Sequence, residues 1–369
     1  MERALCPVLV GRGDELSILE DALLAANRGQ GSVVALAGDA GLGKTRLATE
    51  LERRAHAIGA EVLSGGCSEA DLSLPYLPLL EAIGNYLAGA NVEAVSARLG
   101  PSARELGQLF PQLGASDGGA QDVESAQAKL RLFEAMIALL RVPADDHGLL
   151  LVIEDLHWAD ASTRELLDYM TRRLRQTRIM VLATYRRDEM HRKHPLAPII
   201  QGWRRSGGAT VVELEPLDHV QLASMIRSIF DVNEVSDEFV NFLHDRSEGN
   251  PFVLEEMLKE AIDRGDLYRS ETGEWERKDL AQLAIPQSVA DSILARVERM
   301  DPDHADVLRA AAVLGPTFEY ESLVVLTDLP EDVVQAALTS CVQQQLIVEA
   351  ERARGVYRFR HALTREAVY

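Results

Sequence analysis

Apolar runs of strand length recur along the first part of the chain and alternate with segments of helical spacing. The runs are Glu61–Leu63, Val33–Ala37, Leu149–Ile153, Ile179–Ala183 and Thr210–Leu214. The helical patterns between them include a segment that ends near Ala26, then Lys44–Ala57, Tyr76–Ala88, Ala103–Phe110, Asp122–Leu140 and Ser162–Arg175. Strands that are apolar throughout are typical of a parallel sheet covered on both faces. The pattern therefore predicts an α/β domain, a P-loop NTPase fold with a parallel sheet, over residues 1–216.

The remainder of the chain is mostly helical in pattern. The expected elements are helices at Asp218–Phe230, Ser236–Ser247 and Pro251–Arg264, a hairpin at Leu267–Glu276 that turns at Thr272–Gly273, helices at Ser288–Met300, Pro302–Leu314 and Glu331–Gln344, and a terminal hairpin of Leu346–Val348 with Val356–Phe359. Three helices followed by a hairpin are typical of a winged helix. The expectation is a helical domain over residues 217–284 and a winged-helix domain over residues 285–369, truncated at its end.

The segment that follows the run Val33–Ala37 has the sequence Gly-Asp-Ala-Gly-Leu-Gly-Lys-Thr. A strand, a glycine-rich turn and a helix form the context of a phosphate-binding P-loop, with an incidental glycine-rich turn as the alternative. Gly38 and Gly43 allow the backbone to wrap around phosphates, at which the loop amides and the helix N-terminus direct partial positive charge. Lys44 would reach the β- and γ-phosphates, and the Thr45 hydroxyl would complete a Mg²⁺ shell. The predicted nucleotide-binding residues of this segment are Gly38, Gly41, Leu42, Gly43, Lys44, Thr45 and Arg46.

Two carboxylates, Glu154 and Asp155, follow the apolar run Leu149–Ile153. Acids at the end of a buried strand are costly unless a cation or hydrogen bonds receive them. In a P-loop protein this position lies beside the nucleotide's Mg²⁺. Glu154 is therefore assigned to the metal, and Asp155 to orienting or deprotonating the attacking water. The alternative is that both acids only cap the following helix.

Arg186 follows the apolar run Ile179–Ala183 and should emerge at the same edge of the sheet. A guanidinium at that place could sense the γ-phosphate through a charge-assisted contact that is lost when ADP remains. On position alone, an ordinary surface arginine is an equal alternative.

Composition limits the class of protein. A chain of 369 residues should divide into two or three domains, and 47% hydrophobic with 26% charged residues is typical of a soluble globular protein. The formal net charge of −20 disfavours binding of a polyanion by the chain as a whole. No uncharged apolar stretch approaches about 18 residues, and the start of the chain lacks an export signal. Three widely spaced cysteines disfavour a disulfide framework. Together these features lead us to expect no membrane association and a cytoplasmic location.

Taken in order, the motifs resemble those of a known class of ATPase. They are G-R-x-x-E-L, G-x-x-G-x-G-K-T-R-L, L-V-I-E-D-L-H-W-A-D, A-T-Y-R, E-G-N-P-F and F-R-H-A-L-T-R-E-A-V-Y. The set resembles the signal-transduction ATPases with numerous domains (STAND), which are related to AAA+ proteins. Within that class it is most similar to the large ATP-binding regulators of the LuxR family, relatives of the bacterial maltose activator. The resemblance covers essentially all 369 residues.

The resemblance implies a switch that binds ATP or ADP with Mg²⁺ and hydrolyses ATP weakly. Such proteins rest as ADP-bound monomers, exchange to ATP when an inducer binds, and then self-associate. By the same resemblance, Val10 and Arg12 correspond to the adenine-side segment, Pro251 packs on adenine, and His361 reaches the ADP β-phosphate. Glu154 stands where this motif more usually has Asp, and its longer side chain could shift Mg²⁺ and slow hydrolysis.

The output of the switch is expected to lie outside this chain. Sequence ends at Tyr369 within a helix expected after the terminal hairpin, which favours a piece of a longer protein. In the LuxR relatives, helical sensor repeats and a DNA-binding helix-turn-helix follow, so DNA would be bound only there. The same core also precedes adenylate cyclase domains. A constitutive AAA+ ATPase of the DNA-loading type is the main alternative from another class, and a P-loop kinase fits less well.

Overall fold

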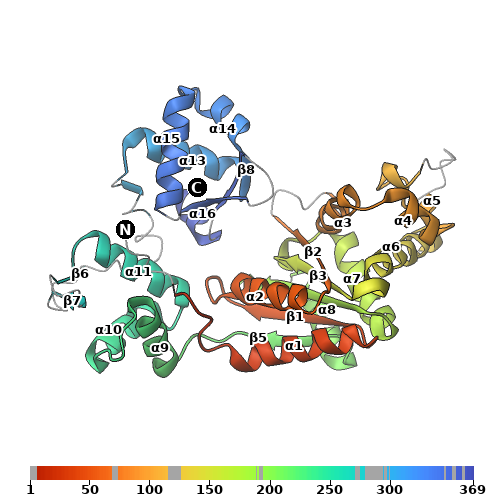
Figure 1. The fold of residues 1–369 in the computed structure, drawn as a ribbon, viewed down its shortest axis with the longest axis horizontal. Helices are drawn as coiled ribbons and strands as arrows, with labels where there is room; N and C mark the ends of the chain where they lie inside the picture. Colours follow the sequence, from red (N-terminus) through yellow and green to blue (C-terminus); the bar gives the residue numbers. More distant parts are fainter. Residues whose placement is uncertain are drawn as a thin grey trace. The chain divides into compact units, whose positions relative to one another are not determined.

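The chain divides into two compact units in the computed structural model, whose elements are labelled in Figure 1. We call Arg12–Asp39 with Lys44–Leu214 the α/β unit, and Met1–Gly11 with Ala40–Gly43 and Glu215–Tyr369 the C-terminal unit. The structure describes residues 6–68, 74–114, 126–187, 189–190, 194–270, 275–278, 294, 297–298, 300–344, 346–350, 355–359 and 362–369.

The α/β unit contains a five-stranded parallel sheet with the order β2-β3-β4-β1-β5. Its strands are β1 (Ser32–Gly38), β2 (Glu61–Gly66), β3 (Leu149–Glu154), β4 (Ile179–Arg186) and β5 (Thr210–Glu213). Each coincides with a predicted apolar run, so the predicted parallel sheet is confirmed. The order places β4 between β1 and β3, so the P-loop and the two acids that follow β3 are separated by the width of one strand.

Both faces of the three central strands of this sheet, β3, β4 and β1, are buried. Leu149, Leu151 and Ile153 of β3 belong to a core cluster that includes residues of α3, α6, α7 and α8. Leu150 and Val152 are equally buried and, by the alternation of strand side chains, face the other side, where α1 and α2 contact the strands. The uninterrupted apolar runs of β1, β3 and β4 are explained by this two-sided cover, because almost every position of these three strands is buried, whereas β2 and β5 keep exposed positions.

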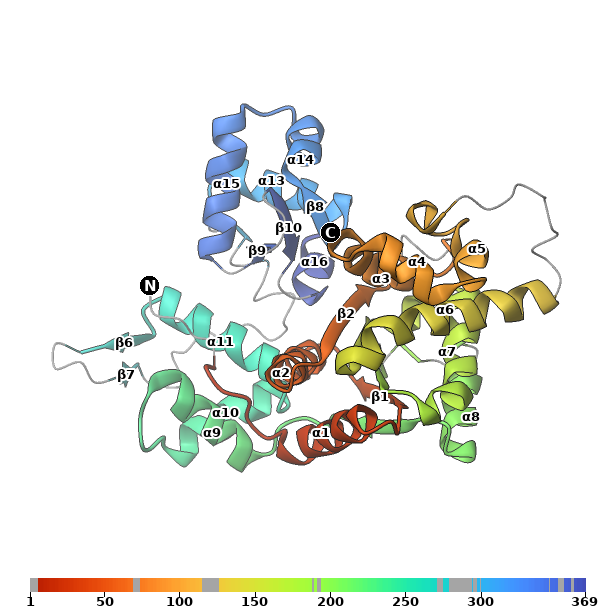
Figure 2. The same ribbon diagram turned by 45° about the vertical axis from the view of Figure 1, so that its right-hand side comes forward.

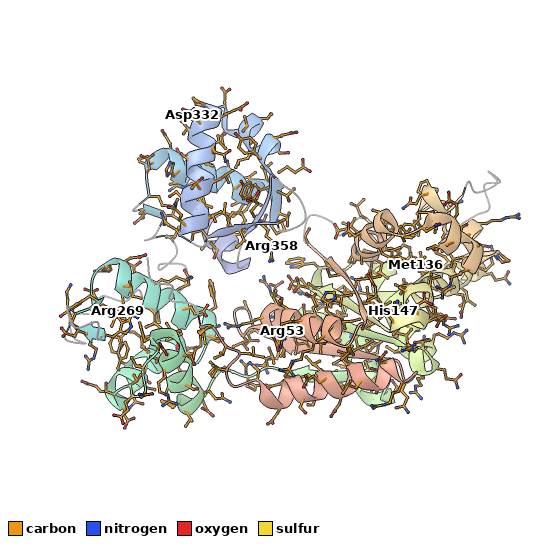
Figure 3. All side chains as sticks on the ribbon, in the orientation of Figure 1. Arg53, Met136, His147, Arg269, Asp332 and Arg358 are labelled. Carbon is orange, nitrogen blue, oxygen red and sulfur yellow. The ribbon has the colours of Figure 1, made fainter. Side chains whose placement is uncertain are left out.

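The helices of the α/β unit cover these two faces and extend one end of the sheet. They are α1 (Gly13–Asn27), α2 (Lys44–Ala57), α3 (Leu77–Gly89), α4 (Val92–Leu99), α5 (Ser102–Leu106), α6 (Ala126–His147), α7 (Ala161–Arg173) and α8 (Ala197–Ser206), with short 3-10 turns at Pro111–Leu113, Leu156–Trp158 and Leu174–Gln176. Figures 1 and 2 both show α3, α4, α5 and α6 gathered beyond β2. Met136 of α6, labelled in Figure 3, is fully buried there.

Some helices differ from the sequence prediction. The helix expected at Ala103–Phe110 ends at Leu106, where a turn at Gly107 begins. The helix expected to end at Leu140 continues through Pro143 to His147. Pro143 removes one backbone N–H, but it is buried with its neighbours against the core, and that packing offsets the lost bond. Helices α4 and α8 were not predicted.

The C-terminal unit is built from helices and two small sheets. Its elements are α9 (His219–Phe230), α10 (Asp237–Ser247), α11 (Pro251–Asp263), β6 (Leu267–Arg269), β7 (Trp275–Arg277), α13 (Pro302–Leu314), β8 (Thr317–Glu319), α14 (Tyr320–Thr327), α15 (Glu331–Gln343), β9 (Ile347–Glu349), β10 (Val356–Phe359) and α16 (Ala362–Val368). Side chains of Asp218, Ser236 and Asn250 cap α9, α10 and α11.

The end of the chain carries one more strand and one more helix than the sequence predicted. Strand β8 pairs antiparallel with β10 on the side opposite β9, which gives a three-stranded sheet in place of a simple hairpin. Strand β8 and α14 are too short to give a clear periodic signal, which explains why they were missed. The turn at Thr272–Gly273 and most of the helix predicted at Ser288–Met300 lie outside the described residues.

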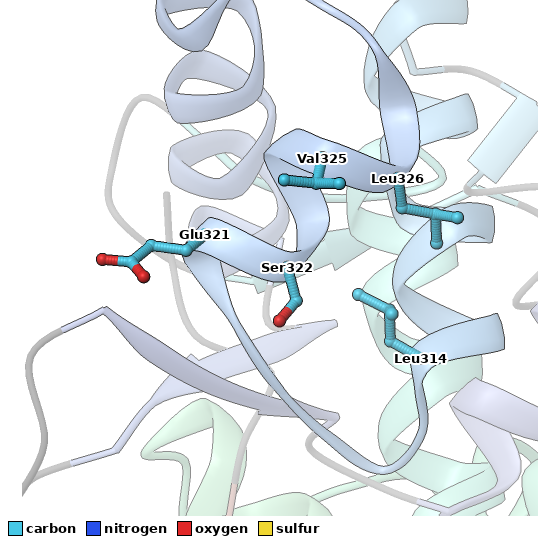
Figure 4. Close-up of a pocket in the computed structure, with 5 residues that line it drawn as sticks. All are labelled: Leu314, Glu321, Ser322, Val325 and Leu326. Carbon is cyan, nitrogen blue, oxygen red and sulfur yellow. The ribbon is translucent and has the colours of Figure 1, made fainter.

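A pocket of about 550 Å³ lies at α14 (Figure 4). It is lined by Leu314, Glu321, Ser322, Val325 and Leu326. Val325 is 83% exposed, so this helix presents an apolar surface to solvent. Within the described ranges, every helix is too short or too polar to cross a lipid bilayer.

Gly65 in β2 provides a test of the packing between β2 and α3. A Cβ at this position would lie 1.9 Å from the carbonyl oxygen of Pro78, a backbone atom that cannot rotate away. We expect Gly65→Ala to lower the free energy of unfolding by about 1–3 kcal/mol in urea titrations. The neighbouring Gly66→Ala is the control, because its Cβ would meet no atom within 4 Å. Equal stability of the two variants would contradict the packing described here.

Candidate nucleotide-binding site

The glycine-rich loop joins the end of β1 to the start of α2. Strand β1 ends at Gly38 and α2 begins at Lys44. Between them, Gly41 and Gly43 have φ angles of +84° and +93°, which side chains with a Cβ rarely adopt. The conformational requirement therefore falls on Gly41 and Gly43, whereas the sequence interpretation assigned it to Gly38 and Gly43.

Lys44 is buried at the base of this loop. Its ammonium donates hydrogen bonds to the carbonyl oxygens of Gly38, at 2.7 Å, and Asp39, at 3.0 Å. Thr45, the next residue, is exposed. A buried cation held by neutral carbonyls and an accessible hydroxyl beside it are the side-chain groups that a P-loop offers to phosphate and Mg²⁺.

Asp155 occupies a constrained backbone position directly after β3. Its φ and ψ are 53° and 46°, in the left-handed region, which is uncommon for a residue other than glycine. The Asp155 N–H donates to the Thr184 hydroxyl of β4 at 3.0 Å. This bond ties the turn after β3 to the neighbouring strand. The carboxylate itself is 38% exposed, so it remains accessible to solvent, and Glu154 is partly buried at the last position of β3.

Arg186, the last residue of β4, is buried next to these acids. Its Nη1 donates to Glu189 Oε1 at 2.8 Å, and its Nε lies 3.9 Å from Asp155 Oδ1. The arginine predicted to sense the γ-phosphate therefore already has carboxylate partners in this structure. Any phosphate contact of Arg186 would compete with Glu189. The sequence interpretation missed Glu189 because only its contact with Arg186 marks it as part of the site.

His157 completes this cluster and was also missed as a site residue, although it lies in the quoted L-H-W-A-D motif. Its Nδ1 accepts from the Arg186 N–H at 3.4 Å, and its Nε2 lies 3.4 Å from Glu189 Oε2. Burial, and then the charges of Arg186, Lys44 and His194, lower the pKa of His157 from 6.5 to about 3. The ring is thus neutral at physiological pH, with its acceptor nitrogen toward β4 and its donor nitrogen toward Glu189.

Arg187 links the end of β4 to the start of the glycine-rich loop. Its N–H donates to the Gly38 carbonyl at 3.4 Å, and its Nε donates to Asp39 Oδ1 at 3.3 Å. Its Nη1 also lies 3.7 Å from Glu213 of β5. The edge of the sheet is therefore fastened across β4, β1 and β5 by one arginine side chain and its backbone.

Asp160 belongs to the frame of this site. It accepts from the N–H groups of Ser162, at 2.7 Å, and Thr163, at 3.1 Å, and so begins α7. It also accepts from the Tyr76 N–H at 3.2 Å, which joins the start of α3 to α7. Asp160 is thus the N-cap of α7, and its role is structural.

The remaining predicted residues are distributed over both units. Arg12 is buried at the N-terminus of α1, 3.6 Å from Glu15. Val10 packs on the core formed by α9, α10 and α11, and Pro251 is the first residue of α11. His361 lies outside the described residues. Leu42 is buried and Arg46 is partly exposed on α2, so both keep their sequence-based assignment as predictions.

A metal ion at this site would need phosphate oxygens of a nucleotide as ligands, in addition to protein side chains. In the part of the chain that the structure describes, no group of three or more His, Cys, Asp and Glu side chains is arranged to hold an ion. Mg²⁺ commonly takes one or two protein ligands together with phosphate oxygens and water. Thr45 and Glu154 fit such a minimal set.

Part of the chain matches a known family. Residues 8–182 match the AAA ATPase domain family, a stretch that contains the glycine-rich loop, Glu154, Asp155 and the first half of β4. Residues 8–182 are an AAA ATPase-type nucleotide-binding domain. In the α/β unit, β4 separates β1 from β3, and the carboxyl ends of all three strands carry the candidate site. The matched stretch ends within β4, before Arg186.

A curated relative extends the likeness to nearly the whole chain. The chain is 26% identical over 386 residues to uncharacterized protein R02095 of Rhizobium meliloti (strain 1021), an alignment that covers 98% of this chain. The chain spans only 35% of the length of that relative.

Solved structures align with nearly the whole chain. One is the STAND protein with a tetratricopeptide repeat sensor from Pyrococcus horikoshii, with a TM-score of 0.52, 18% identity, and coverage of 100% of this chain and 44% of that one. Another is the Orc1 protein of Aeropyrum pernix in complex with DNA, with a TM-score of 0.45, 16% identity, and coverage of 98% and 92%. At 18% identity, the likeness to the STAND P-loop ATPase shows a shared fold alone, and the TM-score of the Orc1 alignment is too low to show a shared fold.

The pKa of His157 leads to a prediction about stability. Below pH 6.5 the unfolded chain takes up a proton at this residue, whereas the folded protein does so only near pH 3. Stability should therefore fall as pH drops from 6.5 toward 3, by up to about 1.4 kcal/mol per pH unit from this group. His157→Asn keeps an acceptor for the Arg186 N–H but cannot be protonated. We expect this variant to lose less stability than wild type between pH 7 and pH 5 in urea titrations.

The control for this prediction is His56→Asn, which changes an exposed histidine of α2. It should keep the pH dependence of the wild type. If His157→Asn shows the same dependence as well, His157 is not held neutral in the folded protein.

Proposed function

We propose that this chain is an ATP- and ADP-binding switch with slow ATPase activity, the regulatory core of a larger signal-responsive transcription regulator. The observation that carries the proposal is the edge of the sheet where Lys44, Thr45, Glu154, Asp155 and Arg186 follow three adjacent strands. These are the groups needed to hold a nucleoside triphosphate with Mg²⁺ and to position a water at its γ-phosphate.

In this proposal the glycine-rich loop and Lys44 bind the phosphates. The ammonium of Lys44 would exchange two neutral carbonyl acceptors for anionic phosphate oxygens, which form stronger hydrogen bonds with a cation. The N-terminus of α2 adds partial positive charge at the same place. Thr45 and Glu154 would hold Mg²⁺, which neutralises phosphate charge when bound.

Asp155 is the candidate to orient the attacking water and accept its proton. Its carboxylate is accessible, while its backbone is held by Thr184 in a left-handed turn, so the direction of the side chain is well defined. The left-handed conformation costs free energy, and such strain is common where a residue must present its side chain to a reaction.

Slow turnover is supported by the surroundings of Arg186. A guanidinium that is paired with Glu189, and that lies near Asp155, must leave or share a carboxylate before it can stabilise phosphate charge. Glu154, in place of the more usual Asp, adds a methylene between the backbone and Mg²⁺. Both features suit a protein that dwells in one nucleotide state for long periods.

The division into domains and the output are part of the same proposal. The order helix, strand, two helices and two strands from α13 to β10 is that of a winged helix, and supports assigning residues 285–369 to one. Residues 1–216 and 217–284 would form the nucleotide-binding and helical domains. An inducer, self-association in the ATP state, and DNA binding by a segment beyond Tyr369 are proposed from the resemblance to LuxR-family regulators, with His361 as the latch on ADP.

Lys44→Ala tests the phosphate site. Loss of the ammonium removes charge-assisted hydrogen bonds to phosphate, so we expect affinity for ATP and ADP to fall by about 100-fold or more in calorimetric titrations. Lys129→Ala, at a partly exposed lysine of α6 that pairs with Glu165, is the matched control and should bind as wild type. Undiminished affinity of Lys44→Ala would refute the site.

Asp155→Asn tests the assignment of the general base. The amide keeps the size of the side chain but cannot accept a proton from water, so hydrolysis should fall by about 100- to 10,000-fold while ATP still binds. The measurements are phosphate release and nucleotide titration on the same preparation. Asp146→Asn, at an exposed acid that pairs with Arg98, should hydrolyse as wild type. An unchanged rate in Asp155→Asn would remove Asp155 from this role.

A further inference from the structure

Asn250 of the G-N-P segment makes contacts on both sides of its amide group. Its Oδ1 accepts from the N–H groups of Phe252, at 3.1 Å, and Val253, at 3.3 Å, and so caps α11. Its Nδ2 donates to the carbonyl oxygen of Ala40, in the glycine-rich loop, at 2.9 Å. One side chain therefore holds the start of α11 and the nucleotide-binding loop at the same time.

The orientation of this amide is fixed by its partners. Two backbone N–H groups at the start of α11 require an acceptor, so the oxygen must face the helix. The nitrogen then faces the loop, where the Ala40 carbonyl is an acceptor. A flipped amide would place oxygen against oxygen on one side and donors against donors on the other.

The loop bond sets the direction of a neighbouring N–H. In a trans peptide the carbonyl and the N–H point in opposite directions, so a held Ala40 carbonyl also fixes the N–H of Gly41. That N–H then points away from Asn250. Gly41 is close enough that a Cβ on it would lie 2.6 Å from Asn250 Oδ1, so the loop packs directly on this side chain.

The segment that carries Asn250 is itself held in place. The carbonyl of Gly249 accepts from the Leu217 N–H at 2.8 Å, next to the start of α9. Gly249 has a φ of +73°, and a Cβ there would lie 2.3 Å from the Leu217 carbonyl oxygen. The three residues of G-N-P thus have separate tasks, since Gly249 allows the close turn, Asn250 makes the bonds and Pro251 begins the helix.

We propose that Asn250 is a positioning residue for the phosphate-binding loop. Through its amide, the affinity for nucleotide depends on the position of the first turn of α11 relative to the loop. The proposal builds on the nucleotide-binding function put forward above. In the free protein the bond to Ala40 holds the loop in one conformation, and this reduces the ordering cost of binding phosphate. A shift of α11 along its axis or away from the loop would release the Ala40 carbonyl and weaken nucleotide binding.

Asn250→Ser separates the two roles of this side chain. Serine caps helices about as well as asparagine and carries no charge, but it has no amide to reach the Ala40 carbonyl while capping. Asn250→Ala removes both contacts. Asn91→Ser is the matched control, because Asn91 caps α4 through the Ala94 N–H at 2.9 Å with the same chemistry.

The first measurement is hydrogen–deuterium exchange of the protein without nucleotide. We expect a peptide that covers residues 40–43 to exchange about five- to tenfold faster in Asn250→Ser, the effect of losing one neutral hydrogen bond. A peptide that covers the first turn of α11 should exchange as in wild type. In Asn250→Ala both peptides should exchange faster, and in Asn91→Ser neither should change.

The second measurement is the affinity for ADP and ATP, together with the thermal midpoint of unfolding. Asn250→Ser should bind both nucleotides about five- to tenfold more weakly at an unchanged thermal midpoint. Unchanged loop exchange and affinity in Asn250→Ser would overturn the proposal. A fall in affinity that merely follows a fall in the thermal midpoint would also overturn it, because Asn250 would then be only a helix cap. If the wild type binds neither nucleotide, the proposed function fails, while the exchange data still decide the role of Asn250 in the loop.

Discussion

The parallel pairing of β4 with both β1 and β3 is the constraint on which the rest of the site depends. Parallel strands end at the same edge of a sheet, so the residues that follow each strand must meet there. Lys44 enters after β1, Asp155 after β3 and Arg186 at the end of β4. With β4 in the middle, the end of β1 and the end of β3 flank the end of β4, so all three groups belong to one edge of the sheet.

Charge at this edge is balanced by a small number of contacts. Arg186 is buried and could not remain so without carboxylate partners, which Glu189 and Asp155 provide. His157 stays neutral because it is buried beside two cations, so it adds hydrogen-bonding groups without adding charge. The arrangement holds Asp155 close to a cation while its carboxylate remains accessible, which is a suitable state for a residue proposed to act on water.

The glycine-rich loop has partners on either side, and this gives the proposed switch a physical basis. Asp39 is held by Arg187, directly after β4, and Ala40 is held by Asn250 at the start of α11. Because different elements hold two consecutive residues of the loop, a movement of either element would change the conformation of the loop. Nucleotide binding would then be sensitive to the helices that follow the AAA ATPase domain, and a signal received there could change affinity through Asn250.

Sequence alone determined the class of fold and the core of the site. The apolar strands predicted a sheet covered on both faces, and the Gly-Lys-Thr segment after the first of them predicted a phosphate loop, because adjacent residues set local geometry and chemistry. Tertiary structure decided the rest. The bond from the Arg186 N–H to His157 and the bond from Asn250 to Ala40 join residues that are distant in the chain, and only folding brings their atoms within hydrogen-bonding distance. The neutral state of His157 likewise depends on its burial beside Arg186 and Lys44.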